Sequence, residues 1–275
     1  MPERKICWRV TRFCNLSCLH CLAGHANTSR SDLARPDLIR AAKVITEVGL
    51  DRITWTGGEP TLCPDLPELL GIMQHAGIAS TITTHGLALR DPFISAVDPS
   101  RDCFRFSFDG MRETHNFIRN AKVYDKALRE LIRMRDLGFR VEANISAMKR
   151  NIADLPELTR LLAESGVSTI VILTLIKRES ALDNNLEALS KEEFGRLKEE
   201  LARITTSFPG LILRINDYNQ EDDSYIILEA DGDIVLSSEL VPDISYGFIT
   251  SSDGARRLRV ALNDHTLRHQ QVMVQ

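Results

Sequence analysis

The stretch ICWRVTRFCNLSCLHC, residues 6–21, joins a short apolar run to three closely spaced cysteines. Its first six residues are typical of a buried β-strand, and the cysteines then follow with the spacing C-x3-C-x2-C. Cys14, Cys18 and Cys21 supply three thiolates, whereas a closed tetrahedral zinc site needs a second Cys or Cys/His pair further along the chain. A fourth ligand must therefore come from outside this loop.

The composition is that of an ordinary soluble globular protein. The chain has 275 residues, of which 43% are hydrophobic and 26% charged, and its net charge of -4 gives no basic excess for binding nucleic acid. The N-terminus has no apolar leader, and no window approaches the ~20 apolar residues that span a bilayer. Six unevenly spread cysteines indicate reduced thiols rather than a disulfide framework. We therefore expect a cytoplasmic protein that is not bound to a membrane.

Short apolar runs alternate with amphipathic helical stretches along the first two thirds of the chain. Strands are predicted at Ile6–Thr11, Arg52–Thr56, Ser80–Thr84, Phe104–Ser107, Arg140–Ser146 and Thr169–Leu173. Ser190 and Glu193 form a capping box that predicts a helix start. Strands that alternate with helices indicate βα units and a parallel sheet, since parallel neighbours need a crossover connection. Pattern alone leaves a partial barrel and an open doubly wound sheet as alternatives.

The last part of the chain has a different character. LILRI and YIILEADGDIVLS, residues 211–215 and 225–237, read as strands, and Asp231-Gly232 suits a tight hairpin turn. We predict a small antiparallel extension over residues 209–275, packed on a core of residues 1–208. No low-complexity linker separates the two regions.

A second motif follows the second predicted strand. In TWTGGEPTL, residues 54–62, two glycines would let the backbone approach a ligand closely, because a Cβ would collide. Glu59 offers a carboxylate for an ammonium group, and Pro60 fixes the exit of the turn. The plain alternative is an ordinary βα turn, which also uses Gly and Pro.

Each segment that is a candidate for ligand binding lies at the end of a predicted strand. The cysteine loop follows the first, Gly57–Pro60 the second, THG (residues 84–86) the third, and SFDG (residues 107–110) ends the fourth. In parallel βα architectures, ligands bind outside the carboxyl ends of the strands. The order of motifs therefore predicts one site at one edge of the sheet.

These motifs together resemble the radical S-adenosylmethionine (radical SAM) superfamily over residues 5–175. No cysteine lies beyond Cys103 that could close a zinc site. The resemblance implies a parallel (β/α)6 partial barrel and one site-differentiated [4Fe-4S] cluster on Cys14, Cys18 and Cys21. It further implies that the open iron binds SAM, that a flavodoxin- or ferredoxin-type donor supplies one electron, and that cleavage of SAM yields a 5'-deoxyadenosyl radical.

The resemblance also implies the residues that contact SAM. The Gly-Gly-Glu-Pro segment would contact the methionine amino group, His20 the adenine, and residues of the fourth and fifth strands the ribose or carboxylate. The THG segment carries His85 where the family commonly has Asn. The predicted cofactor contacts are His20, Gly57, Gly58, Glu59, Pro60, Thr84, Ser107, Asp109 and Asn144.

The extension indicates the substrate class. In many peptide-modifying members of the family, and in its cyclases, this region binds auxiliary clusters through cysteines that this chain lacks. We therefore expect hydrogen-atom abstraction from a small molecule, such as a nucleotide, sugar or natural-product intermediate. Alternatives are a peptide maturase without auxiliary clusters and a non-catalytic iron-sulfur or zinc sensing protein. The predicted substrate contacts are His85, Asp217, Tyr218, Tyr225 and Glu229.

Overall fold

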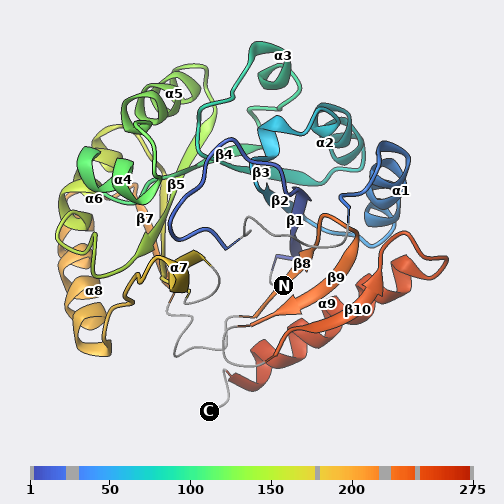
Figure 1. The fold of residues 1–275 in the computed structure, drawn as a ribbon. Coiled ribbons are helices and arrows are strands. Elements are labelled where there is room, and N and C mark those ends of the chain that lie inside the picture. Colours follow the sequence, from blue (N-terminus) through green and yellow to red (C-terminus); the bar gives the residue numbers. More distant parts are fainter. Residues whose placement is uncertain (1–2, 23–30, 177–179, 217–223, 239–241, 273–275) are drawn as a thin grey trace.

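The computed structural model describes residues 3–22, 31–176, 180–216, 224–238 and 242–272. Its described strands form a single sheet in the order β10-β9-β8-β1-β2-β3-β4-β5-β6-β7. Strands β1 to β7 are parallel neighbours in chain order, and β8 pairs in parallel with the other side of β1. Strands β9 and β10 complete that edge in antiparallel orientation. Figure 1 shows the sheet curving into an open ring with helices around its outside.

The bounds of the elements follow the chain from β1 to α9. The strands are Lys5–Thr11 (β1), Arg52–Gly57 (β2), Ala79–Thr84 (β3), Cys103–Ser107 (β4), Arg140–Ala147 (β5), Thr169–Thr174 (β6), Ile212–Asn216 (β7), Tyr225–Leu228 (β8), Asp233–Ser237 (β9) and Ile244–Phe248 (β10). The helices are Arg35–Thr46 (α1), Leu66–His75 (α2), Asp91–Ile94 (α3), Arg112–Ile118 (α4), Tyr124–Asp136 (α5), Leu155–Glu164 (α6), Ser180–Asp183 (α7), Lys191–Thr205 (α8) and Gly254–Val272 (α9), with a 3-10 turn at Pro60–Leu62 (η1). Within the described ranges, no helix is both long and apolar enough to cross a membrane.

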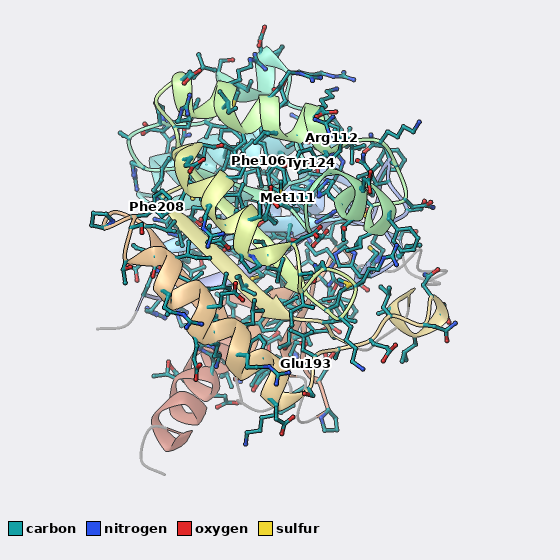
Figure 2. All side chains as sticks on the ribbon, turned by 90° about the vertical axis from the view of Figure 1, so that its left-hand side faces the viewer. Phe106, Met111, Arg112, Tyr124, Glu193 and Phe208 are labelled. Carbon is teal, nitrogen blue, oxygen red and sulfur yellow. The ribbon has the colours of Figure 1, made fainter. Side chains whose placement is uncertain are left out.

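The predicted α/β fold with a parallel sheet and an antiparallel C-terminal addition is confirmed. Each of the six predicted strands lies within one residue of β1 to β6 at both ends. The capping box is present, because Ser190 Oγ accepts from Glu193 N and the Glu193 carboxylate accepts from Ser190 N. Figure 2 looks onto α8, with Glu193 in the first turn near one end and Phe208 near the other. Gly232, with φ of 89°, makes the predicted turn between β8 and β9.

Strand β7 corrects one expectation about the extension. Residues 212–216 pair in parallel with β6, so this segment enlarges the parallel sheet and takes no part in the antiparallel addition. The reason is that α8 precedes it and supplies the long crossover that a parallel connection requires. The domain boundary at residues 208/209 stays a prediction, and β7 shows that the sheet continues across it.

One face of the sheet packs against the helices and forms the core. The rings of Trp8 on β1 and Trp55 on β2 stack with centroids 5.0 Å apart, and both side chains are fully buried. On β4, the buried Phe104 ring lies 5.1 Å from Phe139 and 6.3 Å from Phe93. These apolar contacts join neighbouring strands to each other and to segments that cover the outer face of the sheet.

The opposite, inner face of the sheet is polar. Because side chains alternate along a strand, Cys7 and Arg9 of β1 lie on the face opposite Trp8. In register beside them are Thr54 and Thr56 of β2. Further round the sheet the same face carries Thr83, Arg105, Ser107, Glu142 and Asn144. The inside of the ring is therefore lined by hydroxyl, amide and charged groups rather than filled by an apolar core.

Replacing Phe104 by Ala is expected to lower the free energy of unfolding by about 3–5 kcal/mol, because it removes a fully buried ring. Phe248→Ala is the matched control, since Phe248 is 41% exposed on β10 and its loss leaves no cavity. Denaturant unfolding of both variants measures the difference. Equal losses in the two variants would contradict the packing described for β4.

Candidate functional site

The cysteine loop leaves the carboxyl end of β1 and folds back on itself. Cys14 and Cys21 are partly exposed and Cys18 is buried. Leu16 N donates to Cys14 Sγ at 3.4 Å, and Cys21 N donates to Cys18 O at 3.3 Å. Burial raises the pKa of Cys14 to about 11, so this thiol is protonated at neutral pH until a metal displaces the proton.

The base of this loop is tied to two distant segments. Asp32 accepts from Thr11 Oγ1 at 2.9 Å and from Arg12 N at 2.8 Å, and its other oxygen pairs with the Arg12 guanidinium. Arg12 also lies 3.3 Å from Asp231 in the β8–β9 turn. The C-terminal hairpin therefore helps to fix the start of the cysteine loop.

Gly57 and Gly58 pack directly on the backbone of the cysteine loop. Gly58 N donates to Thr11 O at 2.7 Å, and Glu59 N donates to Phe13 O at 2.8 Å. A Cβ on Gly57 would lie 2.2 Å from Thr11 O, and one on Gly58 would lie 2.2 Å from Phe13 O. The glycines thus allow a close approach to the backbone of the cysteine loop, and their predicted approach to a ligand stays a prediction.

Glu59 is the centre of a buried hydrogen-bond network. Its side chain is buried, and Oε1 accepts from Thr61 N, from Thr61 Oγ1 at 2.6 Å and from Thr84 Oγ1 at 2.7 Å. Oε2 accepts from His85 N at 3.0 Å. The structure thus brings the predicted residues Glu59, Thr84 and His85 together, while Pro60 is buried at the start of η1.

His85 links this network to the cysteine loop. Its Nδ1 accepts from Leu87 N at 3.0 Å, which places the proton on Nε2. That nitrogen lies 2.8 Å from Asn15 Oδ1 and 3.3 Å from Glu59 Oε2. Burial lowers the pKa of His85 and Glu59 opposes the shift, so the imidazole is neutral at pH 7. The histidine in THG therefore spans two motifs, which an asparagine is too short to do in the same way.

Asp109 lies in a buried charge cluster with Arg119 and His20. Arg119 Nε is 2.6 Å from Asp109 Oδ2, and His20 Nε2 is 3.4 Å from the same oxygen. Ser146 N donates to the other oxygen at 3.2 Å. Burial acts to raise the pKa of Asp109, but the charges of Arg119 and His20 outweigh it and hold that pKa well below its usual range.

Arg119 was not among the site residues predicted from the sequence. Its Nη1 lies 3.8 Å from Cys18 Sγ, so one guanidinium joins Asp109 to a thiol of the cysteine loop. The visible signal was a basic residue just beyond the end of α4, which is also the ordinary position for a cation at a helix C-terminus. The pattern therefore could not separate a buried role from a surface one.

The other predicted residues lie at several places. Ser107 and Asn144 are register neighbours on the inner face and both are half-buried. Glu229 follows β8 and accepts two hydrogen bonds from Arg9 Nη1, at 2.9 and 2.8 Å. Tyr225 begins β8 at the amino end, away from the cysteine loop. Asp217 and Tyr218 lie outside the described residues.

The donor set at the loop fits an iron-sulfur cluster. Three thiols on one loop are the ligand type of such clusters, and the Arg119 guanidinium beside Cys18 suits a thiolate. Among the described residues, no three His, Cys, Asp or Glu side chains are gathered to hold a single metal ion. The fit therefore rests on the kind and spacing of the ligands.

Comparison with known families decides the membership. The model of the "Radical SAM superfamily" matches residues 8–162, more than half of the chain. The chain belongs to the radical SAM superfamily. Membership implies a [4Fe-4S] cluster and SAM as the cofactors, and the matched range contains the cysteine loop, Glu59 and Asp109.

The similar radical SAM proteins are named for different reactions. The chain is 29% identical over 223 residues to the Fe-coproporphyrin III synthase of Methanosarcina barkeri, covering 78% of this chain and 55% of that protein. It is 25% identical over 190 residues to a probable GTP 3',8-cyclase of Methanothermobacter thermautotrophicus, covering 68% and 62%. The chain thus spans about half the length of the curated relatives it matches.

Solved radical SAM structures share the fold. Native anSMEcpe with bound AdoMet and Kp18Cys peptide superposes with a TM-score of 0.76 at 13% identity, covering 96% of this chain and 83% of that one. Streptococcus suis SuiB bound to S-adenosylmethionine gives a TM-score of 0.72 at 15% identity, covering 84% and 59%. These likenesses confirm the partial-barrel architecture.

Gly58→Ala is expected to destabilise the protein by about 2 kcal/mol or more, because the new methyl group must push away the Phe13 carbonyl. Gly71→Ala is the control, since a Cβ there has no neighbour within 4 Å and removal of a helical glycine stabilises by about 0.5–1 kcal/mol. Thermal unfolding measures both changes. A Gly58→Ala protein as stable as Gly71→Ala would show that the two backbones do not touch.

Proposed function

We propose that this chain is a radical SAM enzyme that holds one [4Fe-4S] cluster through Cys14, Cys18 and Cys21. When bound, the cluster and SAM supply a 5'-deoxyadenosyl radical that abstracts a hydrogen atom from the substrate. The observation that carries the proposal is the direct packing of the Gly57–Glu59 segment on the cysteine loop. It places a buried, fully oriented carboxylate beside the loop that would bind the cluster.

The residues of the chain would then bind and orient SAM. Glu59 would receive its ammonium group, because Oε2 has fewer hydrogen-bond partners than Oε1 and Thr84 and His85 hold the carboxylate in place. Ser107 and Asn144 on the inner face offer a hydroxyl and an amide to the polar parts of SAM. Asp109, by contrast, is committed to Arg119 and His20, so we propose that it positions these residues.

A small-molecule substrate is the better supported of the two enzyme readings. Relatives that cover more than two thirds of this chain are named as a porphyrin synthase, a GTP cyclase and a nucleotide dehydratase. The alternative, a peptide maturase without auxiliary clusters, draws on neighbours solved with peptides, whose low identity supports the fold alone. An external one-electron donor of the flavodoxin or ferredoxin type would reduce the cluster.

A non-catalytic sensing protein is the alternative from a different class. Such a protein would need the cysteine loop but not the carboxylate network behind it. The buried Glu59 carboxylate accepts from four neutral donors, and among the described residues it has no Lys or Arg partner, so a cation that reached it would complete its charge pairing. The network therefore favours an enzyme that binds the ammonium group of SAM.

Replacing Cys14, Cys18 and Cys21 together by Ala is expected to abolish cluster binding. The wild-type protein, reconstituted anaerobically, should hold about four irons and four sulfides per chain, and the variant none. Cys63→Ala is the control and should keep the full iron content, because Cys63 packs in the core. Iron and sulfide analysis decides the outcome, and iron retained in the triple variant would contradict the single site.

Glu59→Gln is expected to weaken SAM binding by about 1.5–3 kcal/mol, since it removes the charge that faces the ammonium group. The amide keeps the size of the side chain, so iron content should stay near that of the wild type. Glu68→Gln on the exposed surface of α2 is the matched control and should bind SAM normally.

Calorimetric titration of SAM into each reconstituted protein gives the affinities. If Glu59→Gln keeps its cluster and binds SAM as tightly as the wild type, residues Gly57–Pro60 form an ordinary turn and do not bind SAM. A melting temperature recorded for each sample separates loss of binding from loss of fold.

A further inference from the structure

The inner face of the sheet carries polar side chains that no part of the described chain satisfies. Thr54, Thr56 and Thr83 are half-buried there, and their hydroxyl groups form no hydrogen bond with any described residue. Buried polar groups in proteins are normally hydrogen-bonded to protein, water or ligand. These half-buried hydroxyl groups are therefore available to water or to a polar ligand.

Two guanidinium groups on the same face have unused donors. Arg9 engages Glu229 through Nη1 alone, which leaves Nε and Nη2 without a partner among the described residues. Arg105 engages Glu142 through Nε and Nη2, and its Nη1 has no partner in the described part of the chain. Both arginine side chains are about one fifth exposed, at 22% and 20%. Each guanidinium group is thus held in place by its glutamate and remains accessible.

The two arginines lie in one row of the sheet although their strands are not adjacent. Arg9 is in register with Thr56, and Thr83 is in register with Arg105. The register of β2 and β3 pairs Trp55 with Ile82, so the next residues, Thr56 and Thr83, continue the same row. The row from Arg9 to Arg105 therefore crosses the inner face from β1 to β4. Arg9 lies on the same face of β1 as Cys7, and β1 leads directly into the cysteine loop.

We propose that the substrate carries an anionic group, a carboxylate or a phosphate, which binds Arg9 and Arg105 on the inner face of the sheet. The guanidinium edge matches the paired oxygens of either anion. Thr56 is in register beside Arg9, and Thr54 is in register beside Cys7 on the same face, so both hydroxyl groups are available to complete the contact. This inference rests on the proposed function, because the anion would lie on the inner face of β1, the strand that leads into the cysteine loop.

Glu229 has a defined part in this site. Its carboxylate pairs with Arg9 Nη1 at 2.8 Å, so it competes with an anionic ligand for the guanidinium. Burial raises the pKa of Glu229, and the charge of Arg9 opposes that shift. Removing its charge should therefore strengthen binding of an anion, whereas removing Arg9 should weaken it.

The test is a titration of anaerobically reconstituted, SAM-loaded protein with two probes at fixed ionic strength. Inorganic pyrophosphate represents the phosphate source and propane-1,2,3-tricarboxylate the carboxylate source. Calorimetry compares the wild type with Arg9→Gln, Arg105→Gln, Glu229→Gln and the double variant Arg9→Gln/Glu229→Gln. Arg35→Gln is the control, because Arg35 is an ion-paired arginine on the outer surface of α1.

One of the probes should bind the wild type, at least about tenfold more weakly in Arg9→Gln and Arg105→Gln. Glu229→Gln should bind it about two- to fivefold more tightly, and Arg35→Gln should match the wild type. The double variant leaves no unpaired charge at this position and should still bind weakly, which separates lost recognition from lost stability.

The inference is overturned if neither probe binds the wild type, or if Arg9→Gln and Arg105→Gln bind as the wild type does. An equal loss in Arg35→Gln would overturn it too, since it would reduce the effect to general surface charge. The electron paramagnetic resonance spectrum of each reduced sample, with and without SAM, tests the proposed function separately. A wild-type spectrum that SAM leaves unchanged would refute that function, while the arginine dependence of anion binding would still decide this inference.

Discussion

The contact between two glycines and the backbone of the cysteine loop is the constraint on which the rest of the site depends. Gly57 and Gly58 approach Thr11 and Phe13 so closely that no side chain fits between them. That approach sets the position of Glu59, whose carboxylate then orders Thr84 and His85. The His85 side chain in turn lies within hydrogen-bond distance of Asn15, so the network returns to the cysteine loop. Three motifs that are distant in the sequence therefore behave as one unit.

Charge is distributed in two distinct ways around this unit. Asp109 is buried and Arg119 is mostly buried, and the two charges pair with each other, which is the arrangement in which loss of one partner costs most. Arg9 and Arg105 are accessible and only partly engaged by their glutamates. The first pair fixes the wall behind Cys18, whereas the second leaves donors free towards the inside of the ring. One ion pair thus stabilises the site, while the other two leave charged groups available for binding.

Much of this could be predicted from the sequence because it is local. Short apolar runs predicted β1 to β6, a capping box predicted the start of α8, and Asp231-Gly232 predicted the hairpin. The order of motifs along the strands also placed Cys14, Glu59 and Thr84 at one edge of the sheet. Local patterns could not reveal what the glycines touch, where Arg119 points or which strand β7 joins. Each of these depends on segments brought together only by the folded sheet.

The position of β1 has a consequence for how the protein folds. One of its two neighbours is β8, more than 200 residues later in the chain, and the Arg9–Glu229 and Arg12–Asp231 pairs span the same interval. Contacts between segments so far apart form only after a large loop has closed, so β1 gains its full set of neighbours late in folding. The loop with Cys14, Cys18 and Cys21 starts from this strand, and its base is therefore held in part by contacts that the chain makes only when the whole sheet has assembled.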